Sequence, residues 1–169
     1  MEGIMEFRKM RRNRQELSKE MCEDILFKGT SGVLALLGDN DYPYALPLSY
    51  VYDGDKLYFH SSLHGHKIDA IKRSEKASFC VVDKDEIRPL EYTTYFRSII
   101  AFGKIRIIEN DDLKREAIQK LAIKYAPNDS ELNRNKEIEK DSKQLCMLEM
   151  SIEHLTGKEA IELVRGRNM

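Results

Sequence analysis

Residues 45–67 read ALPLSYVYDGDKLYFHSSLHGHK, and this stretch carries the pattern that decides the fold. The segment 44–52 is rich in β-branched and aromatic residues, which is typical of a strand. The sequence DGD at 53–55 predicts a tight turn, and KLYFH at 56–60 alternates polar and apolar residues as a second strand does. Pro47 cannot donate a ladder hydrogen bond, so we expect it at a sheet edge, at a bulge or where the ladder opens.

More strands are predicted on both sides of this stretch. The apolar run at 32–37 and the turn sequence GDND at 38–41 predict a hairpin with residues 44–52. Gly103 is expected to bend a long later strand. The six predicted strands are residues 32–37, 44–52, 56–60, 77–83, 94–109 and 145–154. Many short strands joined by tight turns predict a mainly β (α+β) fold, a six-stranded antiparallel barrel with peripheral helices rather than a doubly wound sheet.

Helices are predicted at the edges of this pattern. Residues 13–28 carry an apolar stripe at helical spacing, with Asn13 as the cap, Glu16 completing a capping-box-like pair and Gly29 as the stop. Residues 111–125 form a second helix with acidic residues in its first turn.

Two further segments complete the helical prediction. A short amphipathic helix follows Lys67 and ends near Arg73. The polar segment 128–143 is expected to be a mobile region or a solvated helix.

The chain's composition predicts one domain over residues 1–169, with residues 1–28 as an N-terminal helix region. With 28 Lys and Arg against 29 Asp and Glu, the net charge of −1 gives no global field for nucleic acid or anionic lipid. No stretch is apolar over the roughly 20 residues that a membrane helix needs, and no secretion signal is recognisable. We therefore expect a cytoplasmic protein whose three cysteines are reduced thiols.

The junction at 60–67, HSSLHGHK, is the richest candidate site. Serine hydroxyls, a lysine cation and the free N–H groups at a helix start all favour an anion such as phosphate. The glycine spacing of a Walker loop is absent. A purely structural alternative stays open, in which Ser61 and Ser62 cap the helix and Lys67 is solvated.

Other chemistries for the junction are weaker. His60, His64 and His66 could ligate a metal with Asp69 nearby, but their spacing matches no familiar zinc motif. A lone strand histidine such as His60 is more often hydrogen-bonded and half-buried than catalytic. No nucleophile elbow exists, so a serine hydrolase is disfavoured.

Four segments together resemble the flavin-binding split-barrel family of pyridoxamine 5'-phosphate oxidase, specifically its nitroimidazole-resistance (Nim-type) branch. These segments are GTSGVLALL, ALPLSYVYDGDKLYFHSSLHGHK, YFRSIIAFGKIRII and LTGKEAIEL, in this order along most of the chain. The resemblance implies a six-stranded antiparallel split β-barrel that binds FMN, with FAD as an alternative.

The resemblance also implies which residues form the site. The expected cofactor-binding residues are Pro47, Leu48, Ser49, Tyr50, His60, Ser61, His66, Lys67, Arg97 and Ser98. The 47–50 segment would pass the flavin ring through main-chain groups, whereas Ser61, His66 and Lys67 would hold the phosphate. His60 would lie beside the flavin or the substrate as the catalytic residue, and no metal is expected.

Arg97 and Ser98 match a strand that reaches the cofactor near a subunit interface, so a homodimer with shared sites is implied. Many oxidase relatives carry arginine where this chain has His66, so phosphate affinity is expected to be lower or pH-dependent. The substrate clamp of true pyridoxamine phosphate oxidation is not recognisable near the C-terminus, which disfavours vitamin synthesis.

The function implied is that of a flavin-dependent oxidoreductase resembling 5-nitroimidazole reductases of antibiotic resistance. NADH or NADPH would supply hydride, and the substrate would be a flat, electron-poor small molecule. His60 would orient the substrate or donate a proton. The alternative is a non-catalytic flavin or small-ligand-binding protein of the same fold. Neither nucleic acid nor a membrane is an expected partner.

Overall fold

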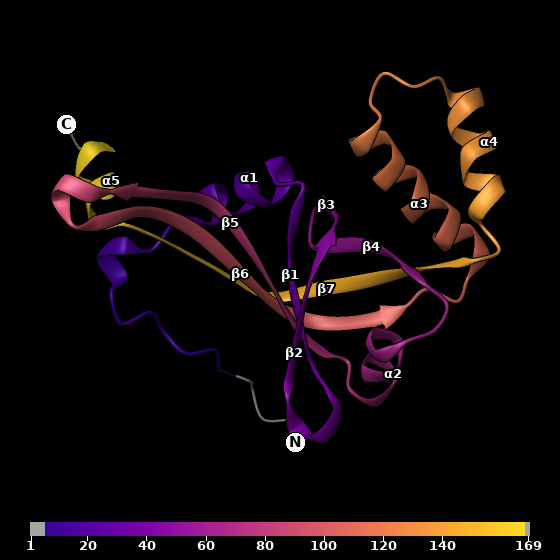
Figure 1. Cartoon of the computed structure of the whole chain (residues 1–169), viewed down its shortest axis with the longest axis horizontal. Helices are drawn as coiled ribbons and strands as arrows, with labels where there is room; N and C mark the ends of the chain where they lie inside the picture. Colours follow the sequence, from indigo (N-terminus) through magenta and orange to yellow (C-terminus); the bar gives the residue numbers. More distant parts are fainter. Residues whose placement is uncertain (1–5, 168–169) are drawn as a thin grey trace.

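The computed structural model describes residues 6–167, which form one antiparallel sheet with helices around it (Figure 1). Within this range the sheet has seven strands in the order β2-β1-β5-β6-β7-β4-β3. The strands are β1 (Ser31–Leu37), β2 (Pro43–Ser49), β3 (Val51–Asp53), β4 (Lys56–Ser62), β5 (Lys76–Arg88), β6 (Thr93–Ile107) and β7 (Leu145–Glu159). The described helices are η1 (Asn13–Gln15), α1 (Lys19–Lys28), η2 (Asp39–Asp41), α2 (His66–Arg73), η3 (Pro89–Glu91), α3 (Asp111–Tyr125), α4 (Glu131–Asp141) and α5 (Ile161–Arg167).

The predicted split barrel is confirmed, but the strand count of six is wrong because residues 44–52 form two strands. β2 pairs with β1 at one edge of the sheet, and β3 pairs with β4 at the other edge. The chain crosses between the two edges at Tyr50, which belongs to neither strand. This crossing of the chain therefore connects the two edges of the sheet. β2 and β3 do not pair with each other, although they follow one another in the sequence.

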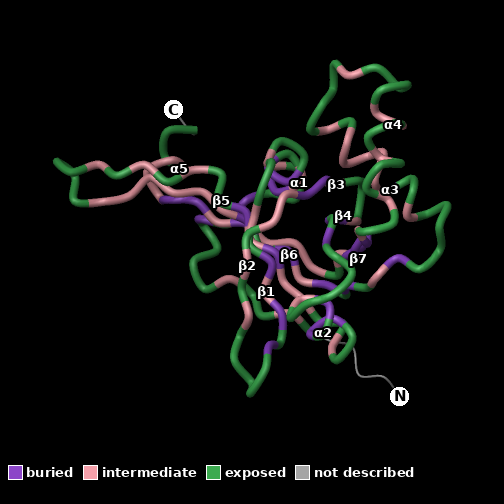
Figure 2. Tube along the Cα trace, turned by 45° about the vertical axis from the view of Figure 1, so that its right-hand side comes forward, coloured by how far each residue is buried: buried purple, intermediate pink, exposed green. Residues whose placement is uncertain are grey.

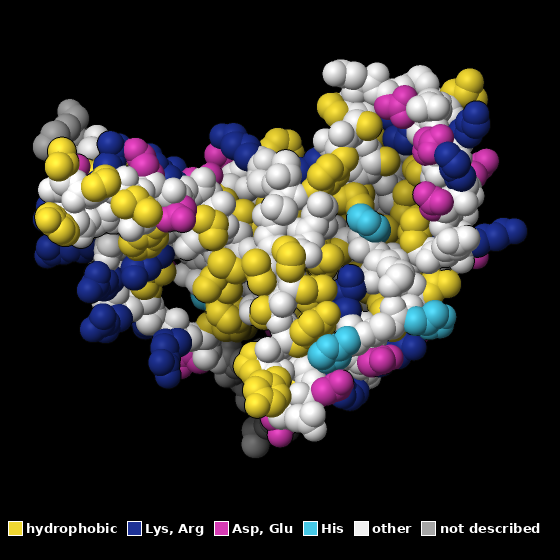
Figure 3. Space-filling view, in the orientation of Figure 1, with side chains coloured by type: hydrophobic (Ala, Val, Ile, Leu, Met, Phe, Trp, Pro, Cys, Tyr) yellow, Lys and Arg dark blue, Asp and Glu magenta, His cyan; other side chains and the backbone are white. Residues whose placement is uncertain are grey.

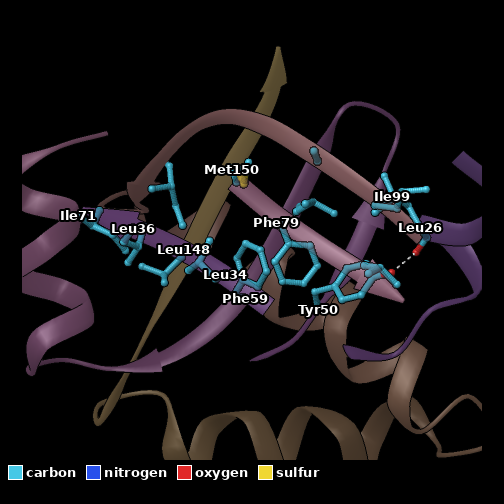
Figure 4. Packing of buried hydrophobic residues seen from close by; sticks show 14 of the residues in the cluster. Leu26, Leu34, Leu36, Tyr50, Phe59, Ile71, Phe79, Ile99, Leu148 and Met150 are labelled. Carbon is cyan, nitrogen blue, oxygen red and sulfur yellow. Dashed lines mark hydrogen bonds between the residues drawn. The ribbon is translucent and has the colours of Figure 1, made fainter. Parts of the chain in front are cut away.

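Tyr50 is fixed at this crossing by its side chain. The side chain is fully buried, and its hydroxyl donates a hydrogen bond of 2.8 Å to the carbonyl of Leu26. Its ring packs edge-on against Phe79, which in turn packs against Phe59 (Figure 4). Burial raises the pKa of the Tyr50 hydroxyl, so the neutral donor persists at any physiological pH. These contacts place the crossing in the centre of the main core.

The first helix begins later than predicted. Asn13 lies in η1 and does not cap α1; Ser18 does, accepting a hydrogen bond of 3.3 Å from the Met21 N–H. The intervening residues join the sheet, because the Leu17 N–H bonds to the Gly157 carbonyl at 2.9 Å. Sheet pairing thus replaces the first helical turns that the apolar spacing predicts.

The other helices follow the prediction more closely. α3 has the predicted bounds, and its cap is Asn110, whose side chain accepts from the Leu113 N–H at 2.9 Å. Most of the polar 128–143 segment is helix α4, which has no buried residue. No helix within residues 6–167 is long and apolar enough to cross a membrane.

The core lies where the strands cross at the middle of the molecule, while hairpin tips and α4 are exposed (Figure 2). β4 separates two apolar clusters because successive side chains of a strand point to opposite faces. Leu57 and Phe59 point into the main cluster, whereas Tyr58 and its neighbour Met147 belong to a second cluster beneath α3. This second cluster places the α3–α4 pair over the outer face of β4.

The strands β5 and β6 extend as an arm away from the rest of the sheet (Figure 1). Leu90 and Tyr92 near the tip of the arm are 97% and 98% exposed. β6 changes register against β7 between Phe102 and Gly103, which confirms the predicted bend. A side chain at Gly103 would overlap the carbonyl of Ser151, so the close strand approach requires glycine.

Candidate functional site

A groove of about 450 Å³ lies between the α3–α4 pair and the outer face of β4 and β7. We call it the helical groove. Figure 3 shows hydrophobic side chains in this hollow and charged side chains over the two helices. Its lining residues are Ser49, His60, Ile118, Leu121, Ala122, Tyr125, Ala126, Asp129, Arg134, Glu137, Ile138, Asp141, Leu145 and Met147. The predicted site residues Ser49 and His60 are therefore brought together in one concave surface.

His60 is exposed on β4 and lies opposite Met147 of β7. The alternation of β4 directs it away from the main core and toward the helical groove. Its surroundings there are largely apolar, with Leu145 and Met147 from the sheet and Leu121 from α3. An imidazole in such a place can donate or accept a proton next to a small molecule held against the sheet.

Ser61 points the other way, into the protein, and is only 4% exposed. Its hydroxyl has no nitrogen or oxygen partner among the described residues and lies beside the Cys146 thiol. The neighbouring thiol of Cys146 bonds instead to the Ser62 carbonyl, with 3.3 Å between sulfur and oxygen. A buried hydroxyl without a partner is costly, so Ser61 is suited to receive a ligand atom.

Lys67, the second residue of α2, lies on the same side of β4 as Ser61, since each acts on the Cys146 thiol. Burial lowers the pKa of Lys67, because removal from water disfavours the ammonium form. Within residues 6–167 no carboxylate forms an ion pair with it. A cation that is half-buried and unpaired would be stabilised by an anionic ligand.

The start of α2 leaves backbone donors available. Gly65 is the residue before the helix, has φ of 121° and provides no side-chain cap. Ser62 does not cap the helix either, because its hydroxyl donates to the His64 carbonyl at 2.8 Å. The capping part of the structural alternative, with Ser61 and Ser62 as caps, is therefore wrong, and Lys67 is half-buried. Ser61, Lys67 and the α2 start, here named the α2 donor cluster, have the donor set that binds phosphate.

His66 lies at the same helix start but faces elsewhere. Its ring stacks on Tyr44 with 4.0 Å between centroids, and its Nε2 lies 3.4 Å from the Asp39 N–H that donates to it. Asp39 is also held by Arg73 at 2.6 Å, which lowers the pKa of the Asp39 carboxyl. These contacts direct His66 to the β1–β2 turn, and they do not join it with Ser61 and Lys67.

The remaining residues of the 47–50 segment lie on or beside an edge strand. β2 pairs only with β1 in the described sheet, so one side of its backbone is free of ladder hydrogen bonds. Pro47 is exposed, Leu48 packs on the main core, and the Tyr50 side chain is committed to the core. A ligand beside this segment would therefore meet main-chain groups and the Ser49 side chain.

Arg97 and Ser98 lie on the β5–β6 arm, far from the helical groove within one chain. Ser98 pairs with Lys158 of β7, whereas His60 pairs with Met147 of the same strand. The intervening length of β7 is about 36 Å at roughly 3.3 Å per residue. Arg97 is held by Asp83 at 3.1 Å and by the fully buried Glu159 at 3.0 Å. One chain does not bring the predicted site residues into a single cluster.

The metal alternative finds no support in the geometry. Among residues 6–167 no group of three His, Cys, Asp or Glu side chains is placed to hold an ion. His60 faces the helical groove, His66 stacks on Tyr44, and His64 is exposed on the loop between them.

The residues that the sequence prediction missed come from α3 and α4. Ile118 and Leu121 form one wall of the helical groove, and Arg134, Glu137 and Asp141 lie on the other. A signal existed in the spacing of the α4 residues, because positions three or four apart share a helix face. The segment is largely polar, so its sequence alone does not distinguish the face that lines the groove.

Comparison with known proteins assigns the fold to a family. The family model described as pyridoxamine 5'-phosphate oxidase matches residues 18–159, which is most of the chain. An uncharacterized protein of Rhizobium meliloti is 33% identical over 67 residues, a match that spans 40% of this chain and 43% of that protein. The match thus covers less than half the length of this curated relative.

Two solved structures show the same architecture. A proposed 5-nitroimidazole antibiotic resistance protein of Bacteroides thetaiotaomicron has a TM-score of 0.72 at 20% identity, over 85% of this chain and 86% of that one. The FAD and heme binding protein of Mycobacterium smegmatis has a TM-score of 0.71 at 24% identity, over 87% of this chain and 73% of that one. At these identities the likeness shows the shared fold.

Proposed function

The chain belongs to the pyridoxamine 5'-phosphate oxidase family, and on this premise we propose that it is a flavin-binding oxidoreductase. The observation that carries the proposal is the α2 donor cluster. It combines a buried hydroxyl without a nitrogen or oxygen partner, a half-buried lysine without a counter-ion among the described residues and an uncapped helix start. All three features would be satisfied by the phosphate of a flavin nucleotide.

The names of the similar structures support the same cofactor class. One of them binds FAD and heme, another is described as an FAD-binding protein, and a third is a proposed 5-nitroimidazole resistance protein. We propose FMN as the cofactor, with FAD as the alternative, because the α2 donor cluster accounts for one phosphate group. Ser61 and Lys67 would hold that phosphate, and the 47–50 segment would border the ring through its backbone.

The chemistry that a bound flavin supplies is hydride transfer from NADH or NADPH to an electron-poor substrate such as a nitroimidazole. The protein's part is to bind, orient and protonate. His60 at the floor of the helical groove would orient the substrate and donate a proton to it. The apolar walls of Ile118, Leu121 and Met147 would exclude water from the reacting face of the substrate.

A homodimer is part of the proposal. Arg97 and Ser98 are too far along β7 to meet His60 of their own chain, so a second copy would have to bring them to the flavin. Exposed apolar residues that such an interface could cover follow β1, β5 and β6, namely Val33, Leu37, Val82 and Ile100. A cytoplasmic location remains a prediction of the sequence.

The test is to purify the chain and measure its absorption spectrum, then release and identify any bound flavin by heating and chromatography. We expect a flavin band near one cofactor per chain. A colourless chain that also fails to bind added FMN or FAD would contradict both the proposed cofactor and the proposed reductase activity.

Stopped-flow mixing with NADH or NADPH in the absence of oxygen then separates the enzyme from a non-catalytic flavin binder. Rapid bleaching of the flavin band, followed by recovery of colour on addition of a nitroimidazole, is the expected result for the enzyme. Persistent colour in the presence of both nucleotides identifies a binding protein.

A further inference from the structure

The charges that line the helical groove are unequal. Asp129, Glu137 and Asp141 contribute three carboxylates, against the single guanidinium of Arg134. Arg134 is already engaged, since its Nε donates to the Gln119 side-chain oxygen at 3.0 Å and its Nη1 to the Asp129 carbonyl at 3.4 Å. The groove therefore has an acidic rim with an excess of two negative charges over the one guanidinium, whose N–H groups donate to protein atoms.

The carboxylates are less engaged with cations. Asp129 accepts from the neutral side-chain amide of Asn133, at 2.9 and 3.0 Å, and its carboxylate forms no ion pair among residues 6–167. Glu137 lies 3.2 Å from Lys140 in a pair that is more than half exposed on both sides, where such pairs contribute little. For Asp141 the described residues provide no ion-pair partner.

The floor and inner walls of the groove are apolar. Ile118, Leu121 and Ile138 face one another from α3 and α4, with Leu145 and Met147 of β7 beneath them. The two helices are joined to each other by polar contacts, such as Gln119 with Asn135 and Lys114 with the Ser142 carbonyl at 3.1 Å. The space left between them suits a flat hydrophobic body with a polar group at its outer end.

We propose that the helical groove selects a flat apolar substrate that carries a positive charge, and discriminates against one that carries a carboxylate. The ring would lie on Leu145 and Met147 next to His60, with the cationic group at the rim beside Glu137 and Asp141. This inference rests on the proposed function in that it takes the bound molecule to be the substrate presented to His60.

The test measures binding of three matched probes by isothermal titration calorimetry. The probes are para-nitrobenzyltrimethylammonium, neutral para-nitrobenzyl alcohol and anionic para-nitrophenylacetate, and each is titrated into the full chain with and without FMN. We expect the cation to bind about tenfold more tightly than the anion at low salt, with the neutral probe between them. Added salt should reduce this ratio, because the rim is exposed.

The variant Glu137→Gln/Asp141→Asn removes two charges from the rim and changes no apolar contact. We expect it to lower the cation-to-anion ratio below about threefold and to leave the neutral probe unchanged. The matched control is Glu131→Gln, which removes one charge from the start of the same helix outside the groove and should keep the ratio.

Equal affinities for cation and anion, a preference for the anion, or no binding of the cation at millimolar concentration would overturn the inference. A cation-to-anion ratio that survives in the double variant would do the same. A chain that binds flavin but does not distinguish the probes contradicts this inference alone. A chain that binds no flavin but prefers the cation contradicts the proposed function and leaves the charge selection standing.

Discussion

His60 and Ser61 are consecutive residues of β4, yet they occupy opposite environments. His60 is exposed in a largely apolar groove under α3 and α4, whereas Ser61 is buried beside the Cys146 thiol and belongs to the α2 donor cluster. The cause is the pleat of the strand, which directs successive side chains to opposite faces. In the proposed function, anchoring of a phosphate and selection of a substrate would therefore be separated by the thickness of one strand. Substitutions on the two faces should then have different effects.

The largest expected effect is on the outer face. His60→Ala should lower turnover of an electron-poor substrate by about 100-fold or more, because a positioned proton donor contributes on this scale. Flavin content and the free energy of unfolding should change little, since His60 is exposed and outside the core. Steady-state kinetics, the absorption spectrum and urea unfolding measure the three quantities. Turnover equal to that of the wild type would remove His60 from the mechanism.

On the inner face, Lys67→Met should weaken FMN binding by about 10- to 100-fold, since charge-assisted hydrogen bonds to an anion are lost. The measurement is titration of the flavin-free chain with FMN. Lys72→Met, which removes an exposed lysine of the same helix, is the control and should bind FMN normally.

The same substitution tests the lowered pKa of Lys67. The folded chain holds the Lys67 proton less tightly than the unfolded chain, so between the lowered pKa and the ordinary value of 10.5 the unfolded state binds more protons. Stability of the flavin-free wild type should therefore rise with pH in that alkaline range, and Lys67→Met should lack this part of the increase. Thermal melts across the range measure it, and identical pH profiles would contradict the assignment.

Tyr50→Phe tests whether the crossing segment meets the flavin only through its backbone. Loss of the hydrogen bond to the Leu26 carbonyl should cost about 1–2 kcal/mol of stability and leave FMN affinity unchanged. Urea unfolding and FMN titration measure the two effects. A large loss of affinity without loss of stability would place the Tyr50 hydroxyl in the cofactor site.

The smallest effect is expected for Ser61→Ala. FMN affinity should fall about threefold to tenfold, a loss of about one neutral hydrogen bond, while the flavin-free chain keeps or slightly gains stability, because a buried hydroxyl without a partner is removed. Ser62→Ala is the matched control on the opposite face of β4, and we expect it to leave FMN affinity unchanged. Equal effects of the two substitutions would contradict the separation of the two faces.

The fold was predicted where local chemistry is decisive. The DGD sequence gave the β3–β4 turn, and the apolar spacing with two aspartates gave both ends of α3. Prediction failed where distant strands compete for the same backbone. The Leu17 N–H bonds to β7, so α1 begins later than its apolar spacing predicts. Residues before and after Tyr50 pair with opposite edges of the sheet, so the predicted strand 44–52 is two strands. A local sequence pattern does not show which distant strand will pair with a given segment.

The site divides in the same way. The residue types at 60–67 predict an anion site, because hydroxyls, a lysine and a helix start have that chemistry wherever they meet, and the site stays a prediction. Which of these residues share one side of β4 was decided by tertiary structure. Strand alternation turned Ser61 inward to the Cys146 thiol, which Lys67 also influences, and stacking on Tyr44 turned His66 away from both. The helical groove could not be predicted from the sequence, because Met147, Leu121 and Glu137 come from separate elements that only packing brings together.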